Sequence, residues 1–144
     1  MYATGRVLND EEVMKVFNKW YNRYKNNDPF SSFAVFLNNE FIGHSTLGHS
    51  GHPGISECSI LLLKPYWGKG YGYEISNTMV NEYSHTLIEE NYLIDGEPLK
   101  KVLATARTDN IPSNKMLMKC GFKKTKENIL YGNNRNFYEL NINK

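Results

Sequence analysis

The chain has 144 residues, of which 40% are hydrophobic and 22% are charged, a composition typical of one globular domain with a buried core. Seventeen Lys and Arg against fifteen Asp and Glu give a formal charge of +2, which is too small to indicate a nucleic-acid-binding surface. Two cysteines are too few for a disulfide framework, so we expect a reducing compartment.

The sequence carries no targeting or membrane signal that we can identify. The first ten residues contain neither a basic stretch nor an apolar run, and the longest apolar run, residues 60–63, is too short to cross a bilayer. There are no internal repeats or linkers. We therefore expect a single domain over residues 1–144, located in the cytoplasm and without a membrane or nucleic-acid partner.

The first half of the chain predicts one helix followed by three strands. Acidic residues follow Asn9, and apolar residues then recur at helical spacing, which predicts an amphipathic helix over residues 10–25. Residues 33–37 and 40–47 are predicted to form a hairpin with an Asn-Asn turn. After a loop, residues 56–63 form a third strand, whose four apolar last residues predict a central strand buried on both faces.

The second half alternates helices and strands. A glycine-rich segment, residues 68–72, leads into a helix marked by apolar residues four apart, Ile75, Met79, Tyr83 and Leu87. A polar loop, a strand, a short helix between Pro112 and Gly121, and two last strands follow. The loop spans residues 91–100, the strand spans residues 101–106, and the two last strands span residues 122–126 and 136–142. The order predicts a mixed α/β (α+β) fold with helices packed on a single sheet.

The glycine-rich segment is the most informative part of the sequence. Gly68, Gly70 and Gly72 alternate between a strand and a helix, where glycine lets the backbone approach a ligand. Their amides and the start of the helix would hold phosphate oxygens, and Lys69 would add a positive charge. The alternative is a tight turn that binds nothing.

Two other phosphate-binding loops do not fit these residues. A Walker loop requires Ser or Thr after its Lys, where Gly70 stands. A dinucleotide-binding fingerprint requires Gly five residues after its first Gly, where Tyr73 and Ile75 stand.

Residues 66–71, Tyr-Trp-Gly-Lys-Gly-Tyr, resemble the pyrophosphate loop of the GNAT N-acetyltransferases, in the form typical of the branch with the ribosomal-protein N-terminal acetyltransferases. A second signature of that family, Asn, two residues, Ser, then Gly-Phe after a short helix, is matched by Asn110, Ser113 and residues 121–122. Residues 41–43 and Glu57 also stand where that branch has them. The resemblance covers roughly residues 30–142.

The resemblance implies a single twisted mixed sheet of about six strands, flanked by three to four helices. It also implies a shortened start over residues 1–8. Acetyl-CoA would be the co-substrate. Its pyrophosphate would lie on Trp67, Gly68, Lys69, Gly70, Tyr71 and Gly72. Its pantetheine arm would bind the backbone of Ile60, Leu61 and Leu62, and the side chains of Asn110 and Ser113.

For the chemistry, the resemblance makes Glu57 the first candidate for the general base, acting directly or through water, since a protonated amine cannot attack a thioester. Ser113 is a candidate for relaying a proton. The position of the Tyr that donates a proton in many GNAT enzymes holds Leu117, so Tyr138 and Tyr131 remain weaker candidates for the acid. The alternative for Glu57 is an ordinary surface carboxylate, and for Asn110 a helix cap.

The predicted activity is transfer of an acetyl group to a primary amine, on a protein N-terminus or a small molecule. The alternative is an inactive module that binds acyl-CoA as a sensor or partner. Because no covalent intermediate is needed, Cys58 and Cys120 are interpreted as packing residues. His49 and His52 lie in a loop without a second matched pair, so we expect no metal. A monomer and a homodimer both remain open.

Overall fold

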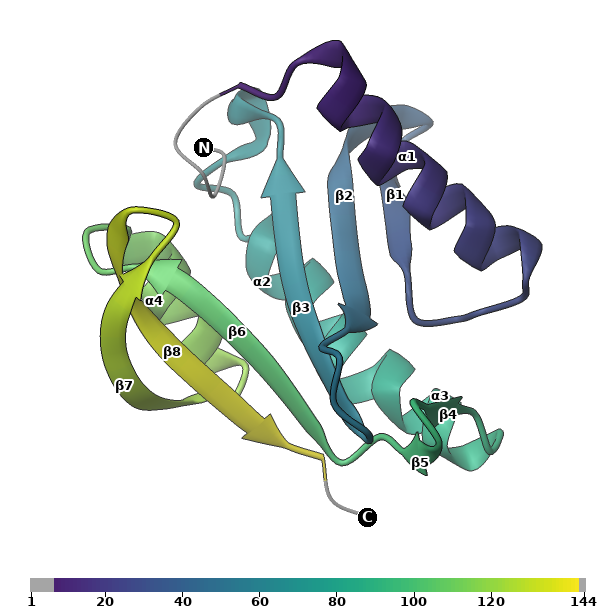
Figure 1. Cartoon of the computed structure of the whole chain (residues 1–144). Helices are drawn as coiled ribbons and strands as arrows, with labels where there is room; N and C mark the ends of the chain where they lie inside the picture. Colours follow the sequence, from purple (N-terminus) through teal and green to yellow (C-terminus); the bar gives the residue numbers. More distant parts are fainter. Residues whose placement is uncertain (1–6, 143–144) are drawn as a thin grey trace.

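The computed structural model of the chain describes residues 7–142, arranged as one twisted sheet with helices on both faces (Figure 1). The shortened start expected over residues 1–8 lies almost entirely outside the described residues. The sheet has six strands in the order β1-β2-β3-β6-β8-β7. β3 and β6 run parallel, and the other neighbouring strands are antiparallel. The expected mixed six-stranded sheet is confirmed.

The strands agree with the sequence prediction to within a few residues at each end. They are β1 (Ser32–Leu37), β2 (Glu40–His49), β3 (Ile55–Leu62), β6 (Lys101–Arg107), β7 (Lys123–Leu130) and β8 (Asn133–Asn141). A separate two-stranded hairpin, β4 (Leu93–Ile94) and β5 (Glu97–Pro98), lies in the segment expected to be only a loop. Its turn is an Asp-Gly pair with positive φ at both residues, a strong hairpin signal.

Helix α1 (Asp10–Lys25) has the predicted bounds, because Asn9 and Glu12 form a capping box at its start. None of its residues is fully buried. Phe17 and Tyr21 remain about half exposed, while Trp20 packs its ring 5.2 Å from the ring of His44 on β2. α1 therefore lies over the sheet as a partial cover of one face.

The helix predicted after the glycine-rich segment is continuous but contains a π-helical stretch. A 3-10 turn, η1 (Lys64–Tyr66), precedes the glycines, and α2 (Tyr71–Asn77), η2 (Thr78–Tyr83) and α3 (Ser84–Glu89) follow with helical dihedrals at their junctions. At the end of η2 the Ser84 N–H bonds to the Met79 carbonyl, five residues back. With α1 and α4 (Ile111–Lys119), the sheet is flanked by three helices.

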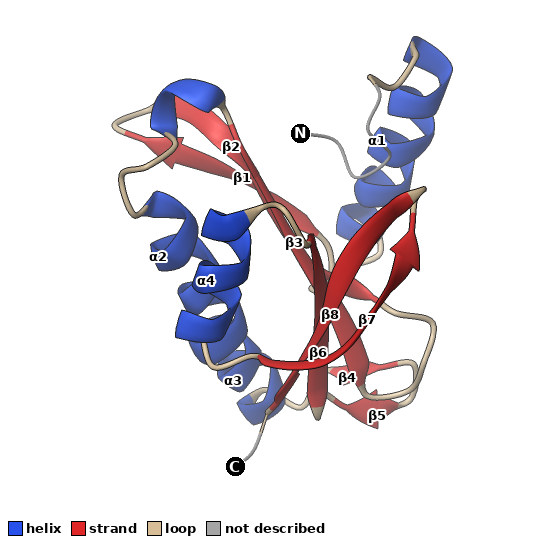
Figure 2. Ribbon diagram, turned by 90° about the vertical axis from the view of Figure 1, so that its left-hand side faces the viewer, coloured by secondary structure: helices blue, strands red, loops and turns tan. Residues whose placement is uncertain are grey.

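The core lies between the sheet and the helices α2, α3 and α4, which cover the face opposite α1 (Figure 2). The largest buried side chains come from both layers: Phe30, Leu47, Val80, Leu87, Val102, Leu117, Phe122, Tyr138 and Ile142. The described helices include none that is long and apolar enough to cross a bilayer.

The sheet is split along its middle. β3 and β6 pair only from Ile55 to Glu57 on one strand and from Lys101 to Leu103 on the other, and then diverge, as Figure 1 shows. The end of β3 was expected to be buried on both faces, which is wrong: its last residues are half-buried, because they border this opening instead of another strand.

Candidate active site

A cavity of about 810 Å³ occupies the split between β3 and β6. Its lining comes from both faces of the sheet. On the helix side it includes Ser76, Met79, Met116 and Ser113, and on the α1 side it includes Trp20, Arg23, His44 and Glu57. The cavity therefore passes through the sheet and connects two surfaces that an unbroken sheet would separate.

The end of β3 turns unpaired backbone groups into this split. The Leu63 N–H bonds to the Ile42 carbonyl on β2 at 2.8 Å, and the register of the two strands pairs Leu61 with His44. In an antiparallel strand, successive residues direct their backbone N–H and C=O groups alternately to the two sides of the strand. The backbone groups of Leu61 therefore face β2, and those of Leu62, Ile60 and Cys58 face the split. Ile60 thus offers the split strand-like hydrogen-bonding groups that the sheet leaves unused, and Leu62 offers its N–H, since its carbonyl accepts from the Trp67 indole.

The glycine loop leaves open space beside its backbone. Gly68 and Gly70 have φ of 74° and 85°, a region that disfavours side chains, and a Cβ on either would meet nothing within 4 Å. The space beside them is therefore open, whereas a Cβ on Gly72 would lie 3.3 Å from the Met116 sulfur. Gly70 caps the start of α2, so the first amides of the helix face the same opening.

Trp67 anchors this loop to the end of β3. Its indole N–H donates to the Leu62 carbonyl at 2.8 Å, which couples the loop position to the strand that borders the split.

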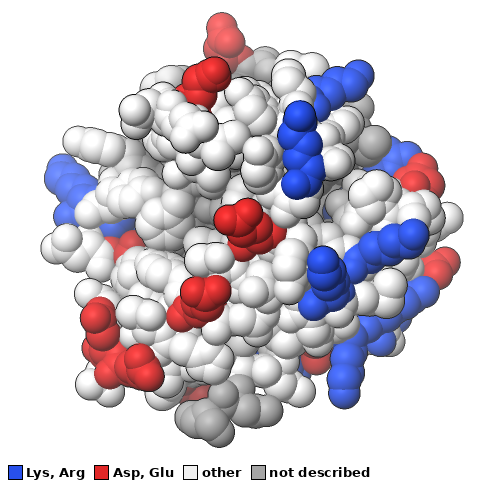
Figure 3. Space-filling model, turned by 180° about the vertical axis from the view of Figure 1, so that it is seen from behind, with Lys and Arg blue, Asp and Glu red and all other residues white. Residues whose placement is uncertain are grey.

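Lys69 is exposed on the loop. Figure 3 shows the helix side of the molecule, where Lys and Arg side chains gather over the half that carries α4 and β7.

Asn110 and Ser113 begin helix α4 at the edge of the cavity. Asn110 is the N-cap, and its Oδ1 accepts from the Ser113 backbone N–H at 3.3 Å, so the capping role considered for it is present. Both residues line the cavity. The Asn110 amide Nδ2 and the Ser113 hydroxyl have no hydrogen-bond partner within residues 7–142, which leaves both groups available to a ligand.

Glu57 lies at the closed end of the split, where β3 last pairs with β6. Its side chain is exposed and lines the cavity from the α1 side. It makes no ion pair with the described part of the chain. A carboxylate in this position can accept a proton from a group held in the cavity.

The sequence profile of the acetyltransferase (GNAT) domain matches residues 1–123 of the chain. This chain belongs to the GNAT acetyltransferase family. Membership makes it an acetyltransferase, with acetyl-CoA as the expected acetyl donor. No curated protein matches its sequence.

Solved structures of GNAT enzymes share the fold. An acetyltransferase of this family from Bacillus anthracis is similar with a TM-score of 0.72 and 20% identity, covering 97% of this chain and 79% of its own. The ribosomal-protein acetyltransferase RimL in complex with coenzyme A has a TM-score of 0.72 and 16% identity, and the match covers 94% of this chain and 75% of RimL. The microcin self-immunity acetyltransferase MccE in complex with acetyl-CoA and AMP has a TM-score of 0.69 and 16% identity, and the match covers 99% of this chain and 77% of MccE.

On the α1 side, this GNAT acetyltransferase has a wall formed by residues of α1 and β2. Trp20 and Arg23 face the cavity from α1, and His44 faces it from β2. Burial lowers the pKa of His44, which keeps its imidazole neutral near pH 7. The rings of Trp20 and His44 make a tilted contact between α1 and β2, and a contact between elements leaves no local signal in the sequence.

A second group that sequence reasoning missed centres on Asn114. Its Nδ2 donates to the carbonyls of Arg107 and Asn110 at 2.9 and 2.8 Å. Its Oδ1 accepts from Asn136 at 2.9 Å and from the Tyr138 hydroxyl at 2.5 Å. Asn114 therefore fixes the start of α4 against the end of β6 and the middle of β8.

The two tyrosines considered as proton donors have different places. Tyr138 is 2% exposed, and its hydroxyl is engaged by Asn114. Tyr131 is exposed at the tip of the β7–β8 hairpin and borders the α1 side of the cavity. Leu117 is buried in the core.

The two cysteines pack in or against the core, and the loop residue His49 has carboxylate partners. Cys120 is buried, and Cys58 is half-buried against the core, where burial raises the pKa of its thiol to about 12. His49 Nε2 lies 2.6 Å from Asp28 Oδ2 and its Nδ1 lies 3.6 Å from Asp95 Oδ1. Within residues 7–142 there is no group of three His, Cys, Asp or Glu arranged to hold a metal ion.

Proposed function

We propose that this GNAT acetyltransferase transfers the acetyl group of acetyl-CoA directly to a primary amine, on a protein N-terminus or a small molecule. The cavity through the sheet carries this proposal, since one opening is lined from the helix side by Ser76, Ser113 and Met116 and also from the α1 side. Acetyl-CoA supplies an activated thioester. The amine nitrogen bonds to the acetyl carbon as the carbon–sulfur bond breaks, and the amine gives up a proton.

The glycine loop and the end of β3 bind the co-substrate in this proposal. The amides of residues 68–72 hold the pyrophosphate, with Trp67 and Tyr71 shaping the loop and Lys69 adding a positive charge. The backbone groups of Ile60 and Leu62 bond to the pantetheine arm like a neighbouring strand, and Leu61 lines the α1 side of the cavity with its side chain.

Asn110 and Ser113 complete the cofactor side. The free Nδ2 of Asn110 donates to the pantetheine arm while its Oδ1 keeps the helix cap. The Ser113 hydroxyl bonds to the co-substrate near the sulfur or relays a proton to it. A neutral leaving thiol requires such a donor, and the hydroxyl of Tyr138 is already engaged.

Glu57 acts as the general base, directly or through a water molecule. An amine with a pKa of roughly 8 to 10.4 is mostly protonated at neutral pH and must lose a proton before or during attack. Glu57 lies on the α1 side of the split, where an acceptor can enter while acetyl-CoA occupies the helix side.

The test is an assay of the full chain with acetyl-CoA and a panel of amines, namely peptides with free N-termini, polyamines and aminoglycosides. Free CoA and acetylated product are measured in parallel. We expect both to appear in equal amounts with at least one acceptor class. Binding of acetyl-CoA without turnover of any amine would instead support an inactive acyl-CoA-binding module.

A further inference from the structure

The cavity carries an excess of positive charge on its α1 side. Five cationic side chains line it, against two carboxylates: Lys19, Arg23, Arg107, Lys126 and Arg135, with Glu57 and Glu139. Glu139 is already engaged, since its Oε1 lies 3.0 Å from Lys101 Nζ. The formal charge of the whole chain is only +2, so the cavity concentrates positive charge beyond what the composition requires.

Arg135 is the buried member of this group. It is 8% exposed, and its Nε and Nη2 donate to the Thr105 hydroxyl and carbonyl at 3.0 and 3.3 Å. These two bonds use two of the five N–H groups of a guanidinium. No carboxylate in the described range lies within 4 Å of it. Removing a charge from water without a counter-charge is unfavourable, and a bound anion would offset that cost.

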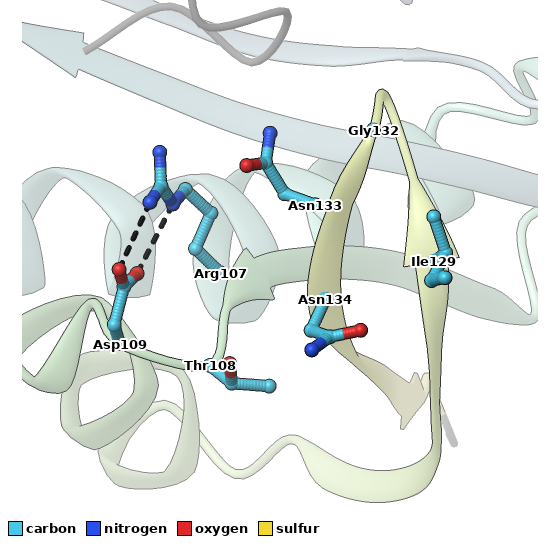
Figure 4. Close-up of a pocket in the computed structure, with 7 residues that line it drawn as sticks. All are labelled: Arg107, Thr108, Asp109, Ile129, Gly132, Asn133 and Asn134. Atoms are coloured by element: carbon cyan, nitrogen blue, oxygen red, sulfur yellow. Dashed lines mark hydrogen bonds and ion pairs between the residues drawn. The ribbon is translucent and has the colours of Figure 1, made fainter.

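A second arginine stands directly opposite Arg135. Arg107 on β6 pairs with Arg135 on β8, and the two side chains share the face of the sheet that borders the cavity. Like charges in directly opposed positions destabilise a sheet. Asp109 forms a two-bond contact with Arg107 at 3.0 and 2.9 Å, beside a smaller hollow of about 460 Å³ (Figure 4). One arginine of the pair is thus neutralised by a carboxylate, and Arg135 is not.

Lys126 adds a further cation on the same face. Its register partner is Phe137, two residues from Arg135, and its Nζ lies 4.9 Å from the Phe137 ring centroid. It forms no ion pair in the part of the chain that the structure covers. The β7–β8 wall of the cavity therefore presents two cations, Arg135 and Lys126, that pair with no carboxylate of the described residues, while Glu139 on the same wall is held by Lys101.

We infer that Arg135 and Lys126 bind an oxyanion of the acceptor, a carboxylate or a phosphate, so that the enzyme prefers amines that carry such a group. This inference rests on the proposed function, because it assigns the acceptor of the same site. Glu57 pairs with Leu103, and Arg135 pairs with Arg107, four residues further along β6. That separation is about 13 Å along the strand, the length of about four residues of extended peptide, and the side chains of Arg135 and of the anionic residue shorten the backbone that must span it.

The anion is therefore expected near the second to fourth residue after the amine of a peptide acceptor. The test uses the full chain, acetyl-CoA and peptide amides that differ only in one isosteric pair: Ala-Ala-Asp-Ala against Ala-Ala-Asn-Ala. A second pair, Ala-Ala-phosphoserine-Ala against Ala-Ala-Ser-Ala, distinguishes a phosphate from a carboxylate. We expect kcat/KM to be about tenfold or more higher for the anionic member of at least one pair, with the difference in KM.

Variants locate the effect. In Arg135→Gln we expect the anionic-to-neutral ratio of kcat/KM to fall to about one. Lys124 is the matched control: it lies on the same strand as Lys126 but pairs with Tyr138 on the opposite face, and Lys124→Gln should keep the ratio of the parent. If Arg135→Gln does not fold, Lys126→Gln, at an exposed position, should still lower the ratio two- to threefold. Equal rates for both pairs in the parent enzyme would overturn the inference without any variant.

Failure of the inference can be separated from failure of the proposed function. If the neutral and anionic peptides are acetylated equally, the acetyltransferase stands and the anion site does not. If no peptide is acetylated, calorimetric titration with the N-acetylated Asp, Asn, phosphoserine and Ser peptides measures binding at the anion site independently of catalysis. Tighter binding of an anionic peptide by the parent, lost in Arg135→Gln, would support the site, and equal binding would overturn it.

Discussion

The hydroxyl of Tyr138 donates a 2.5 Å hydrogen bond to Oδ1 of Asn114, which joins the last long strand of the sheet to the helix that begins at Asn110. The other bonds of the Asn114 amide reach the carbonyls of Arg107 and Asn110. Every polar atom of this buried side chain is therefore used. The arrangement holds the start of α4, which borders the cavity, at a fixed place beside β6.

We predict that replacing Asn114 lowers the free energy of unfolding more than replacing Tyr138, which is one of its partners. Asn114→Ala leaves two donors without a partner, the Asn136 amide and the Tyr138 hydroxyl, and removes one of the two hydrogen bonds accepted by each of the two carbonyls. It should lower the free energy of unfolding by about 3 kcal/mol, while Tyr138→Phe should lower it by about 1 to 2 kcal/mol. Urea unfolding measures both. Asn141→Ala, at an exposed position on β8, is the control and should change it by less than about 0.5 kcal/mol. Equal losses in all three variants would contradict the role of Asn114.

Glu57→Gln should lower kcat by about 10²- to 10⁴-fold, because the amide cannot accept the proton of the acceptor amine. The variant should retain acetyl-CoA affinity, and its rate should rise with pH as more of the free amine becomes deprotonated. Steady-state rates from pH 6 to 10 measure this. Glu97→Gln removes an exposed carboxylate of the β4–β5 hairpin and serves as the control. Unchanged kcat in Glu57→Gln would exclude Glu57 as the base.

Gly43 permits the close approach of β2 and β3, and Gly43→Ala should destabilise the protein strongly. A Cβ at this position would lie 2.1 Å from the Leu61 carbonyl oxygen, so the strands would have to separate. We expect a loss of about 2 to 4 kcal/mol in the free energy of unfolding. Gly48→Ala on the same strand is the comparison, since its Cβ would meet side-chain atoms at 3.2 and 3.5 Å and should cost clearly less. Similar losses would contradict this explanation.

Because of His44, the free energy of unfolding should decrease as the solution becomes more acidic. Burial lowers its pKa, so below the unfolded-state value of about 6.5 the unfolded chain binds more protons at this site than the folded one. The free energy of unfolding therefore decreases as the pH falls from about 6.5 toward the folded-state pKa. Unfolding at pH 7.5 and 5.5 should show a smaller decrease in His44→Gln than in the parent. The same decrease in both would contradict the prediction. His52→Gln, at an exposed loop position, should behave as the parent.

The sequence predicted the elements better than it predicted the contacts between them. The bounds of α1 follow from the local capping box of Asn9 and Glu12, and the glycine loop from a local pattern. The short β4–β5 hairpin was missed although its Asp95-Gly96 turn is a recognised local signal. Burial of the apolar end of β3 was predicted from its composition alone. Composition carries no information on whether a neighbouring strand continues beside it.

The missed site residues depend on register and packing. Arg107 and Arg135 are 28 positions apart and become opposed only through the pairing of β6 with β8. Asn114 stands next to Ser113 of the recognised signature, yet its partners on β6 and β8 are fixed by the position of α4 in the fold. A single sequence cannot supply these relationships, because they arise between segments that are distant along the chain.

The central claim, that the glycine loop binds acetyl-CoA, is tested most directly by thermal unfolding in the presence of acetyl-CoA. Three proteins are compared: the parent, Gly70→Glu and Gly96→Glu. Both glycines have positive φ, 85° and 89°, and open space at the Cβ position, so both variants carry a similar backbone strain, but only Gly70 borders the proposed pyrophosphate site.

We predict that acetyl-CoA raises the melting temperature of the parent and of Gly96→Glu with concentration, as expected from about 2.7 kcal/mol of stabilisation at a hundredfold excess over Kd. Gly70→Glu should show no shift. No shift in the parent at acetyl-CoA concentrations near a millimolar, or an equal shift in Gly70→Glu, would contradict the account.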